Sequence, residues 1–255
     1  MASLILLQQE VEYGREKDMN SINKQARVAG LLYLLASIPA PFALIYVPGK
    51  LIVPGDATAT ADHVRASENL LRLGIASELL GFTIFIFLVL ALYRLFKIVS
   101  ERHSLAMAAL ILVSIPISLF NVINEIAALV LVSGAGFLSV FEKTQLDALA
   151  YLFLRLHGQG NIVAQIFWGL WLFPFGILVI QSGFIPRALG FLLFIAGFGN
   201  LASSLTSLLL PFYAPIIDPF ASVLTAAELP IIFWLLIWGA KDQPLDKQHS
   251  DPALA

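Results

Sequence analysis

Three glutamates, Glu78, Glu125 and Glu228, lie within long apolar stretches of the sequence. A charged side chain inside a bilayer is costly, so such residues by default mark an ion, proton or ligand site. At a helical rise of about 1.5 Å per residue, each glutamate lies roughly 10–15 Å below the same membrane surface. The pattern predicts a layer of carboxylates in one half of a helical membrane domain.

Amide side chains are expected in the same layer. The predicted ligand-binding residues are Glu78, Asn121, Asn124, Glu125, Gln165, Asn200 and Glu228. Ser114, Ser118, Asn121 and Glu125 share one helical face, and such a polar stripe must point into a bundle rather than at lipid. The alternative interpretation is structural: the amides join helices at about 0.6 kcal/mol per hydrogen bond, and the glutamates are protonated and hydrogen-bonded.

His157 is expected at the outer rim of the membrane, where it is a possible gate or metal ligand or a passive interfacial residue. The chain has no cysteine, which excludes thiolate metal sites and thiol catalysis. Zinc-protease, phosphate-loop, dinucleotide and serine-hydrolase motifs are also absent from the sequence. Pro39, Pro41 and Pro230 predict helix breaks near the polar layer, a feature of membrane binding sites. Catalytic residues, cofactor and metal identity are left open.

The composition places these residues in a bilayer. Hydrophobic residues make up 59% of the 255 residues and charged residues 13%, against about 25% charged in soluble domains. Apolar segments long enough to span a bilayer occupy 27–47, 70–96, 105–132, 161–180, 188–210 and 220–240. The predicted fold class is therefore all-α, a polytopic membrane helical bundle with six transmembrane helices.

Charge predicts the orientation and excludes one class of partner. If the N-terminus is inside, only five of the 15 Lys and Arg residues lie outside: Lys50, Arg65, Arg72, Lys143 and Arg155. This asymmetry follows the positive-inside rule and predicts that both termini are cytoplasmic. The formal net charge of −2 argues against nucleic acid as a partner. The bilayer, a small cation or polar ligand, and further copies of the chain are the expected partners.

The segments outside the spans are expected to differ in character. Residues 1–25 are predicted as a cytoplasmic extension without a cleavable signal peptide, 26–240 as the transmembrane domain, and 241–255 as a cytoplasmic tail. A capping-box pattern from Thr144 to Asp147 predicts an amphipathic helix lying on the outer face before the fourth span. Gly158 and Gly160 mark the expected bend between this helix and the span.

The odd-numbered and even-numbered spans show internal similarity. Ser-Ile-Pro recurs in register at 37–39 and 114–116, and Ala-Ser-Glu at 76–78 resembles Ala-Ala-Glu at 226–228. One interpretation is three pseudo-repeated helical hairpins around an axis along the membrane normal. The other is chance similarity among Ala-rich and Leu-rich segments.

Three stretches resemble a known family: MNSINKQARVAGLLYLLASIPAPFALIYVP at 19–48, NVINE at 121–125, and AAELPIIFWLLIWG at 226–239. They are similar to a bacterial family of small membrane proteins catalogued as domain of unknown function 4386. The resemblance covers about residues 20–240. It implies a multi-pass protein of the bacterial inner membrane and supplies no reaction.

Three functions compete at this point. The first is binding or transport of a cation, a proton or a small polar solute through an outward-facing intramembrane pocket of carboxylates and amides. The second is an intramembrane hydrolase acting on lipid, with a carboxylate as base and His157 or a metal assisting. The third is a non-catalytic membrane sensor or partner protein, whose carboxylates only specify packing.

Overall fold

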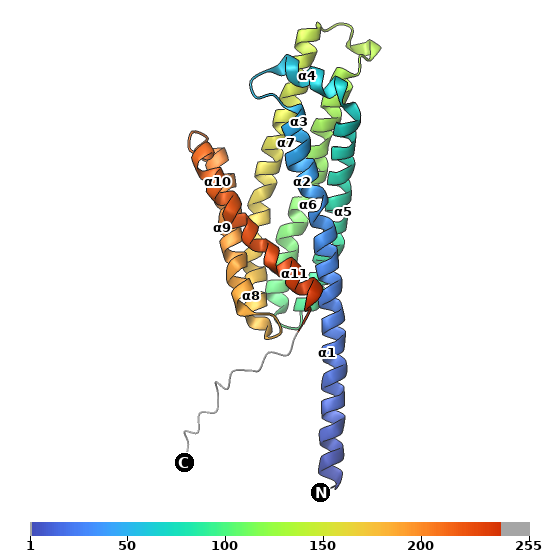
Figure 1. Cartoon of the computed structure of the whole chain (residues 1–255), viewed down its shortest axis with the longest axis vertical. Coiled ribbons are helices and arrows are strands. Elements are labelled where there is room, and N and C mark those ends of the chain that lie inside the picture. The colour runs from blue at the N-terminus through green and yellow to red at the C-terminus, as the bar shows by residue number, and fades with distance from the viewer. Residues whose placement is uncertain (1, 241–255) are drawn as a thin grey trace.

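The computed structural model describes residues 2–240 and is built of helices (Figure 1). In chain order they are α1 (Ala2–Ser37), α2 (Pro39–Pro41), η1 (Phe42–Tyr46), α3 (Val47–Leu51), α4 (Ala57–Ala66), α5 (Glu68–Phe96), α6 (Glu101–Val132), η2 (Gly136–Leu138), α7 (Lys143–Leu170), α8 (Leu172–Ser182), α9 (Arg187–Leu209), α10 (Ala214–Thr225), η3 (Ala226–Glu228) and α11 (Leu229–Ile237). The predicted tail, 241–255, lies outside the described residues.

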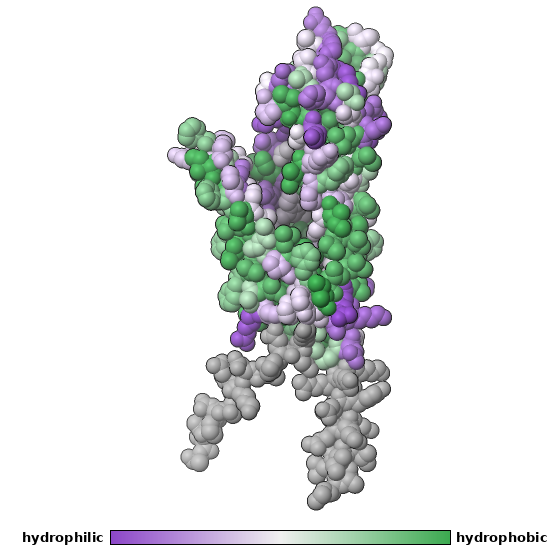
Figure 2. All heavy atoms as spheres, viewed as in Figure 1, coloured by the Kyte–Doolittle hydropathy of each residue, from purple (hydrophilic) through white to green (hydrophobic). Residues whose placement is uncertain are grey.

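Six helical segments of the described chain are long and apolar enough to cross a membrane. They are Met19–Leu51, Glu68–Phe96, Glu101–Val132, Lys143–Ser182, Arg187–Leu209 and Ala214–Ile237. On the face shown in Figure 2, apolar residues form a belt across the middle of the bundle, and polar residues gather toward its two ends. The prediction of an all-α membrane bundle with six spans is confirmed.

The spans pack in sequence order around a ring. α1 packs on α5, α5 on α6, α6 on α7 and α8 on α9, and α11 returns to α1. We call the end that carries α4 the outer end and the opposite end, where α11 finishes beside α1, the inner end (Figure 1). At the outer end α10 packs on α9 and η3 and leans away from α3 and α7, so the ring is closed in its inner half and opens outward.

The inner half is filled by a single apolar core. Its largest fully buried side chains include Tyr33, Phe96, Trp171 and Phe175, and the rings of Trp171 and Phe175 stack with centroids 5.3 Å apart. Lipid tails are as apolar as these side chains, so the core is stabilised by close van der Waals packing rather than by removal from water. Closely packed apolar side chains therefore fill the interior of the bundle below the polar layer.

Glycines let α9 approach its neighbours closely. A Cβ at Gly169 would lie 2.9 Å from the Gly197 carbonyl oxygen, and a Cβ at Gly176 would lie 2.8 Å from that of Gly190. Small residues at such positions are a usual device of membrane helix packing. They fix how α7, α8 and α9 are rotated, and hence which side chains face the interior.

Prolines interrupt the first and sixth spans as expected. The π-helical turn η1 follows Pro39 and Pro41, and the 3₁₀ turn η3 precedes Pro230. Pro230 has no N–H to pair with the Ala226 carbonyl, and the tighter turn of η3 lets the backbone N–H of Leu229 donate to this carbonyl instead.

The expected surface helix before the fourth span is not formed. α7 starts at Lys143, one residue before Thr144, with a capping box between Glu142 and Gln145, and runs as one unbroken helix through Gly158 and Gly160 into the span. A glycine costs a helix only about 1 kcal/mol relative to alanine, and the extensive packing of α7 on α6 can offset this cost. Residues 2–18 likewise continue as one helix with the first span.

Candidate cation site

Glu78, Glu125 and His157 meet in the outer half of the bundle, each supplied by a different helix. They are 4%, 2% and 5% exposed, and one ligand atom from each lies within 4.8 Å of the others. Nε2 of His157 is 3.2 Å from Oε2 of Glu78, and Nδ1 is 3.8 Å from Oε1 of Glu125. The imidazole therefore lies between two carboxylates. We call Glu78, Glu125 and His157 the carboxylate–histidine cluster.

The cluster lies at the depth of the apolar belt. On α5 the 58% exposed Leu73 comes five residues before Glu78, and on α6 the 40% exposed Val130 comes five residues after Glu125. At about 1.5 Å per residue, both carboxylates lie roughly 7 Å below these lipid-accessible side chains. His157 joins them inside the bundle rather than at the outer rim, where the sequence had suggested it would lie.

The polar stripe of α6 faces the interior as predicted. Ser114, Ser118, Asn121 and Glu125 are all buried. Spacing alone determines this: residues four, three and four apart return to one side of a helix with 3.6 residues per turn. The stripe leads from the apolar core up to the cluster.

Amides of α6 and α7 hold His157 in place. Nδ2 of Asn121 donates to the backbone carbonyl of His157 at 2.8 Å and to Oδ1 of Asn161 at 3.1 Å. Nδ2 of Asn161 is 3.4 Å from Nε2 of His157, and Asn124 donates to Oδ1 of Asn121 at 2.9 Å. Asn161 is a site residue that the sequence reasoning missed, although it lies one helical turn after His157.

Gly160 makes room for this arrangement. A Cβ at this position would overlap the side-chain amide of Asn121, whereas a Cβ at Gly158 would meet nothing within 4 Å. Gly160 is therefore a position of close approach between α6 and α7 instead of the bend predicted there.

Two carboxylate oxygens of the cluster lack partners. Oε1 of Glu78 and Oε2 of Glu125 are buried, and neither has a hydrogen-bond partner among the described residues. Buried polar atoms are normally paired, because losing water without a replacement costs free energy. A positively charged ligand bound beside the imidazole would satisfy both of these carboxylate oxygens.

A cavity of about 280 Å³ adjoins the cluster. Its walls are the outer part of the first span, with Leu44, Pro48 and Ile52, and a face of α7. That face contributes His157, Asn161 and Gln165, together with apolar residues such as Trp168. Nearby, the surface is hollowed between the α9–α10 arm and the rest of the bundle (Figure 2). The cluster is thus approached from the outer half.

The remaining predicted ligands lie in separate pairs. Nε2 of Gln165 donates to Oδ1 of Asn200 at 3.3 Å, which joins α7 to α9. The hydroxyl of Tyr33 donates to Oε1 of Glu228, which joins α1 to η3. The structure therefore divides the predicted layer into the carboxylate–histidine cluster with its amides and two interhelical pairs.

A network of charges fastens α4 over the outer end. Arg65 pairs with Asp62 at 2.7 Å and also with the fully buried Asp147 of α7. Lys143 lies 2.9 Å from Asp147 and 3.2 Å from Asp62. Hydrogen bonds from Lys143 and then Arg65 hold the pKa of Asp62 below its usual value. This network explains the burial of Asp147, which the sequence had placed in a capping box.

Comparison with known proteins gives one match. The family model described as "Domain of unknown function (DUF4386)" matches residues 28–239. No curated protein and no solved structure matches the chain. The match covers most of the sequence, including every residue of the carboxylate–histidine cluster, and the chain belongs to the family of membrane proteins with the domain of unknown function 4386.

Proposed function

We propose that this membrane protein binds a divalent transition-metal cation at Glu78, Glu125 and His157. The observation that carries the proposal is the meeting of three buried ligand groups from three helices, two of them with unpaired oxygens. His157 also lines the adjoining cavity. Three protein ligands and one open coordination position are typical of metal sites that exchange ligands or perform chemistry.

The ligand types favour particular metals. An imidazole suits zinc, iron, nickel or copper, and carboxylates suit harder ions such as manganese. Calcium and magnesium prefer sites made of oxygen ligands. A mixed set of two carboxylates and one imidazole therefore points to Zn²⁺, Fe²⁺ or Mn²⁺. Asn161 beside Nε2 and Asn121 on the His157 backbone would orient the imidazole, as outer-shell partners of metal ligands do.

A proton is the second occupant that this geometry suits. The two ring nitrogens of His157 face different carboxylates, so an imidazolium could donate from Nε2 to Glu78 and lie within ion-pair distance of Glu125. A metal would use only one nitrogen, and one carboxylate would have to move toward it. Metal binding and proton binding at the same residues give different responses in the experiment below.

Access to the site constrains transport. The cavity lies in the outer half, while the core around Trp171 and Phe175 fills the inner half. Release of a cation to the inner side would therefore require separation of the helices that pack there. Six spans are few for a monomeric transporter. In a homo-oligomer, neighbouring copies of the chain would supply further helices to line a transport path.

The orientation that we propose follows the charges. Among residues 19–240, the Lys and Arg residues of the inner end are Lys24, Arg27, Arg94, Lys97, Arg102 and Arg187. Basic residues favour the cytoplasmic side of bacterial membranes. The protein would lie in the inner membrane with the N-terminal and C-terminal ends of its transmembrane domain in the cytoplasm. The carboxylate–histidine cluster would then be accessible from the outer side of the membrane.

The test is metal-dependent thermal unfolding of the purified protein, with bound metal counted by mass spectrometry. At a free metal concentration of 100 times Kd, binding stabilises the native state by about 2.7 kcal/mol. We expect this rise in wild type and its loss in Glu78→Gln, Glu125→Gln and His157→Gln. Glu228→Gln is the matched control, because it neutralises a glutamate of the same membrane domain that pairs with Tyr33 outside the cluster.

The outcomes separate the occupants. Stoichiometric metal that disappears in the three variants supports a metal site. Stabilisation that depends on pH but not on metal, and is lost in the same variants, supports a proton site. Equal responses of all five proteins would reject cation binding and favour a structural role.

A metal-dependent lipid hydrolase is the alternative that keeps the same ligands. The apolar walls of the adjoining cavity, among them Leu44, Ile52 and Trp168, favour it. A bound metal would polarise an ester carbonyl or activate water. Release of fatty acid from phospholipid vesicles by the metal-loaded protein, abolished by His157→Gln, would establish this activity. Metal binding without any lipid turnover would leave binding or transport.

A further inference from the structure

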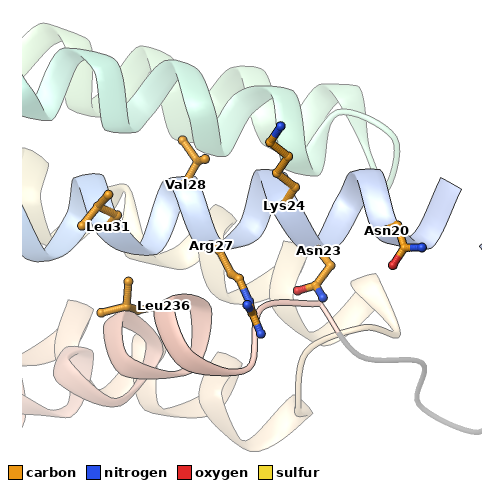
Figure 3. Close-up of a pocket in the computed structure, with 7 residues that line it drawn as sticks. All are labelled: Asn20, Asn23, Lys24, Arg27, Val28, Leu31 and Leu236. Atoms are coloured by element: carbon orange, nitrogen blue, oxygen red, sulfur yellow. The ribbon is translucent and has the colours of Figure 1, made fainter. Parts of the chain in front are cut away.

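A second cavity, of about 460 Å³, lies at the inner end between α1 and α11. It is lined by Asn20, Asn23, Lys24, Arg27, Val28, Leu31 and Leu236 (Figure 3). The residues are ordered along the membrane normal: Asn20, Asn23 and Lys24 lie toward the inner end, and Val28, Leu31 and Leu236 toward the middle of the bundle. One groove thus changes from polar to apolar along its length.

The polar end of the groove is positively charged. Neither Lys24 nor Arg27 forms an ion pair with another described residue. Arg27 donates from Nη2 to the backbone carbonyl of Ile237 at 3.2 Å, which fixes its guanidinium at the end of α11. Their charges therefore remain available to an anion at the level where lipid headgroups lie.

The apolar end can receive an acyl chain. Val28 and Leu31 are each 47% exposed and lie one turn of α1 apart, and Leu236 points from α11 toward α1 near Leu31. At the polar end of the groove, Oδ1 of Asn23 is buried without a hydrogen-bond partner among the described residues. A hydroxyl group on the ligand would satisfy this acceptor.

We propose that this groove binds an anionic phospholipid with a hydroxylated headgroup, phosphatidylglycerol, from the leaflet at the inner end. The phosphate lies against Lys24 and Arg27, a glycerol hydroxyl donates to Asn23, and one acyl chain follows Val28, Leu31 and Leu236. Basic pockets between membrane helices bind anionic headgroups in this way. The bound lipid bridges α1 and α11, the two helices that close the inner half of the ring. This site is independent of the cation site.

The test is native mass spectrometry of the protein released from nanodiscs that contain equal amounts of phosphatidylglycerol and phosphatidylcholine. We expect wild type to retain phosphatidylglycerol preferentially. Lys24→Gln should weaken this retention about fivefold, which corresponds to about 1 kcal/mol for one cation at an anionic surface. Arg27→Gln should weaken it at least as much, although it also removes the contact with Ile237. Lys24 is exposed and makes no such contact, so its variant keeps the test independent of folding.

Arg187→Gln is the matched control, because Arg187 is an exposed cation of the inner end outside the groove. Equal loss of retention in Arg187→Gln and Lys24→Gln would show diffuse attraction to an anionic surface and overturn the proposal. Equal retention of the two lipids by wild type would overturn it as well. Inorganic phosphate added in excess should not displace the lipid. Displacement would show that the groove recognises free phosphate rather than a phospholipid.

Discussion

Replacing Gly160 by alanine should damage the cluster although the new methyl group is small and the site is helical. In an unconstrained helix the change from glycine to alanine stabilises by about 1 kcal/mol. At Gly160 the new Cβ would overlap the side chain of Asn121. Overpacking of this kind costs about 1–3 kcal/mol.

The displaced Asn121 would also lose its hydrogen bonds. Its Nδ2 donates to the carbonyl of His157 and to Asn161, and interhelical bonds in membranes are each worth about 0.6 kcal/mol. We therefore expect Gly160→Ala to lower the free energy of unfolding by about 1–3 kcal/mol, once the gain in helix propensity is included. Without the hydrogen bond from Asn121, His157 would be less well oriented, and cation affinity should weaken roughly 10–100-fold. This is the usual effect of removing a residue that orients a metal ligand.

The measurement is thermal unfolding with and without metal for Gly160→Ala beside Gly158→Ala. A Cβ at Gly158 meets nothing within 4 Å, so this control should be neutral or more stable by up to about 1 kcal/mol. If the two variants behave alike in stability and metal response, the close approach of α6 and α7 at Gly160 does not exist in solution, and the reasoning is refuted.

Three further predictions concern groups outside the cluster. Tyr33→Phe should destabilise the protein without changing the metal response, because it removes the hydroxyl that donates to Glu228. Glu228→Gln keeps a carbonyl oxygen that can accept this hydrogen bond, so it should destabilise the protein less. A changed metal stoichiometry in either variant would contradict this. Asp147→Asn should cost about 1–2 kcal/mol, less than the loss of a fully buried ion pair because Arg65 and Lys143 are partly exposed. It should also speed proteolysis of α4, and unchanged cleavage would show that the charge network does not hold α4 in place. Since the pKa of Asp62 is lowered by Lys143 and Arg65, its contribution to stability is full above the unfolded pKa of about 3.9 and is lost as the pH falls through the lower folded value. Cleavage of the α4 segment by pepsin should therefore rise below about pH 4 in wild type and should change less with pH in Asp62→Asn.

Hydropathy along the chain was sufficient to determine the number and approximate position of the spans. Each span is a local property, because a helix must satisfy its backbone hydrogen bonds within itself and present about 20 apolar residues to lipid. The inward direction of the Ser114–Glu125 face was also determined locally, by helical periodicity. Pro39, Pro41 and Pro230 also predicted where helices are interrupted, because a proline lacks the backbone N–H that a regular helix needs at that position.

The grouping of the polar residues was decided only by the tertiary structure. Counting residues along the spans predicted that Glu228 lies in one layer with Glu78 and Glu125. In the structure, however, the rotation of η3 directs the Glu228 side chain toward Tyr33. His157 joins the cluster because α7 continues as one unbroken helix through Gly158 and Gly160, where a local rule predicted a bend. Depth follows from counting residues, but the rotation of one helix against another follows from contacts such as Gly160 on Asn121 and Gly169 on Gly197. Those contacts join residues far apart in the chain, and no local pattern in the sequence specifies them.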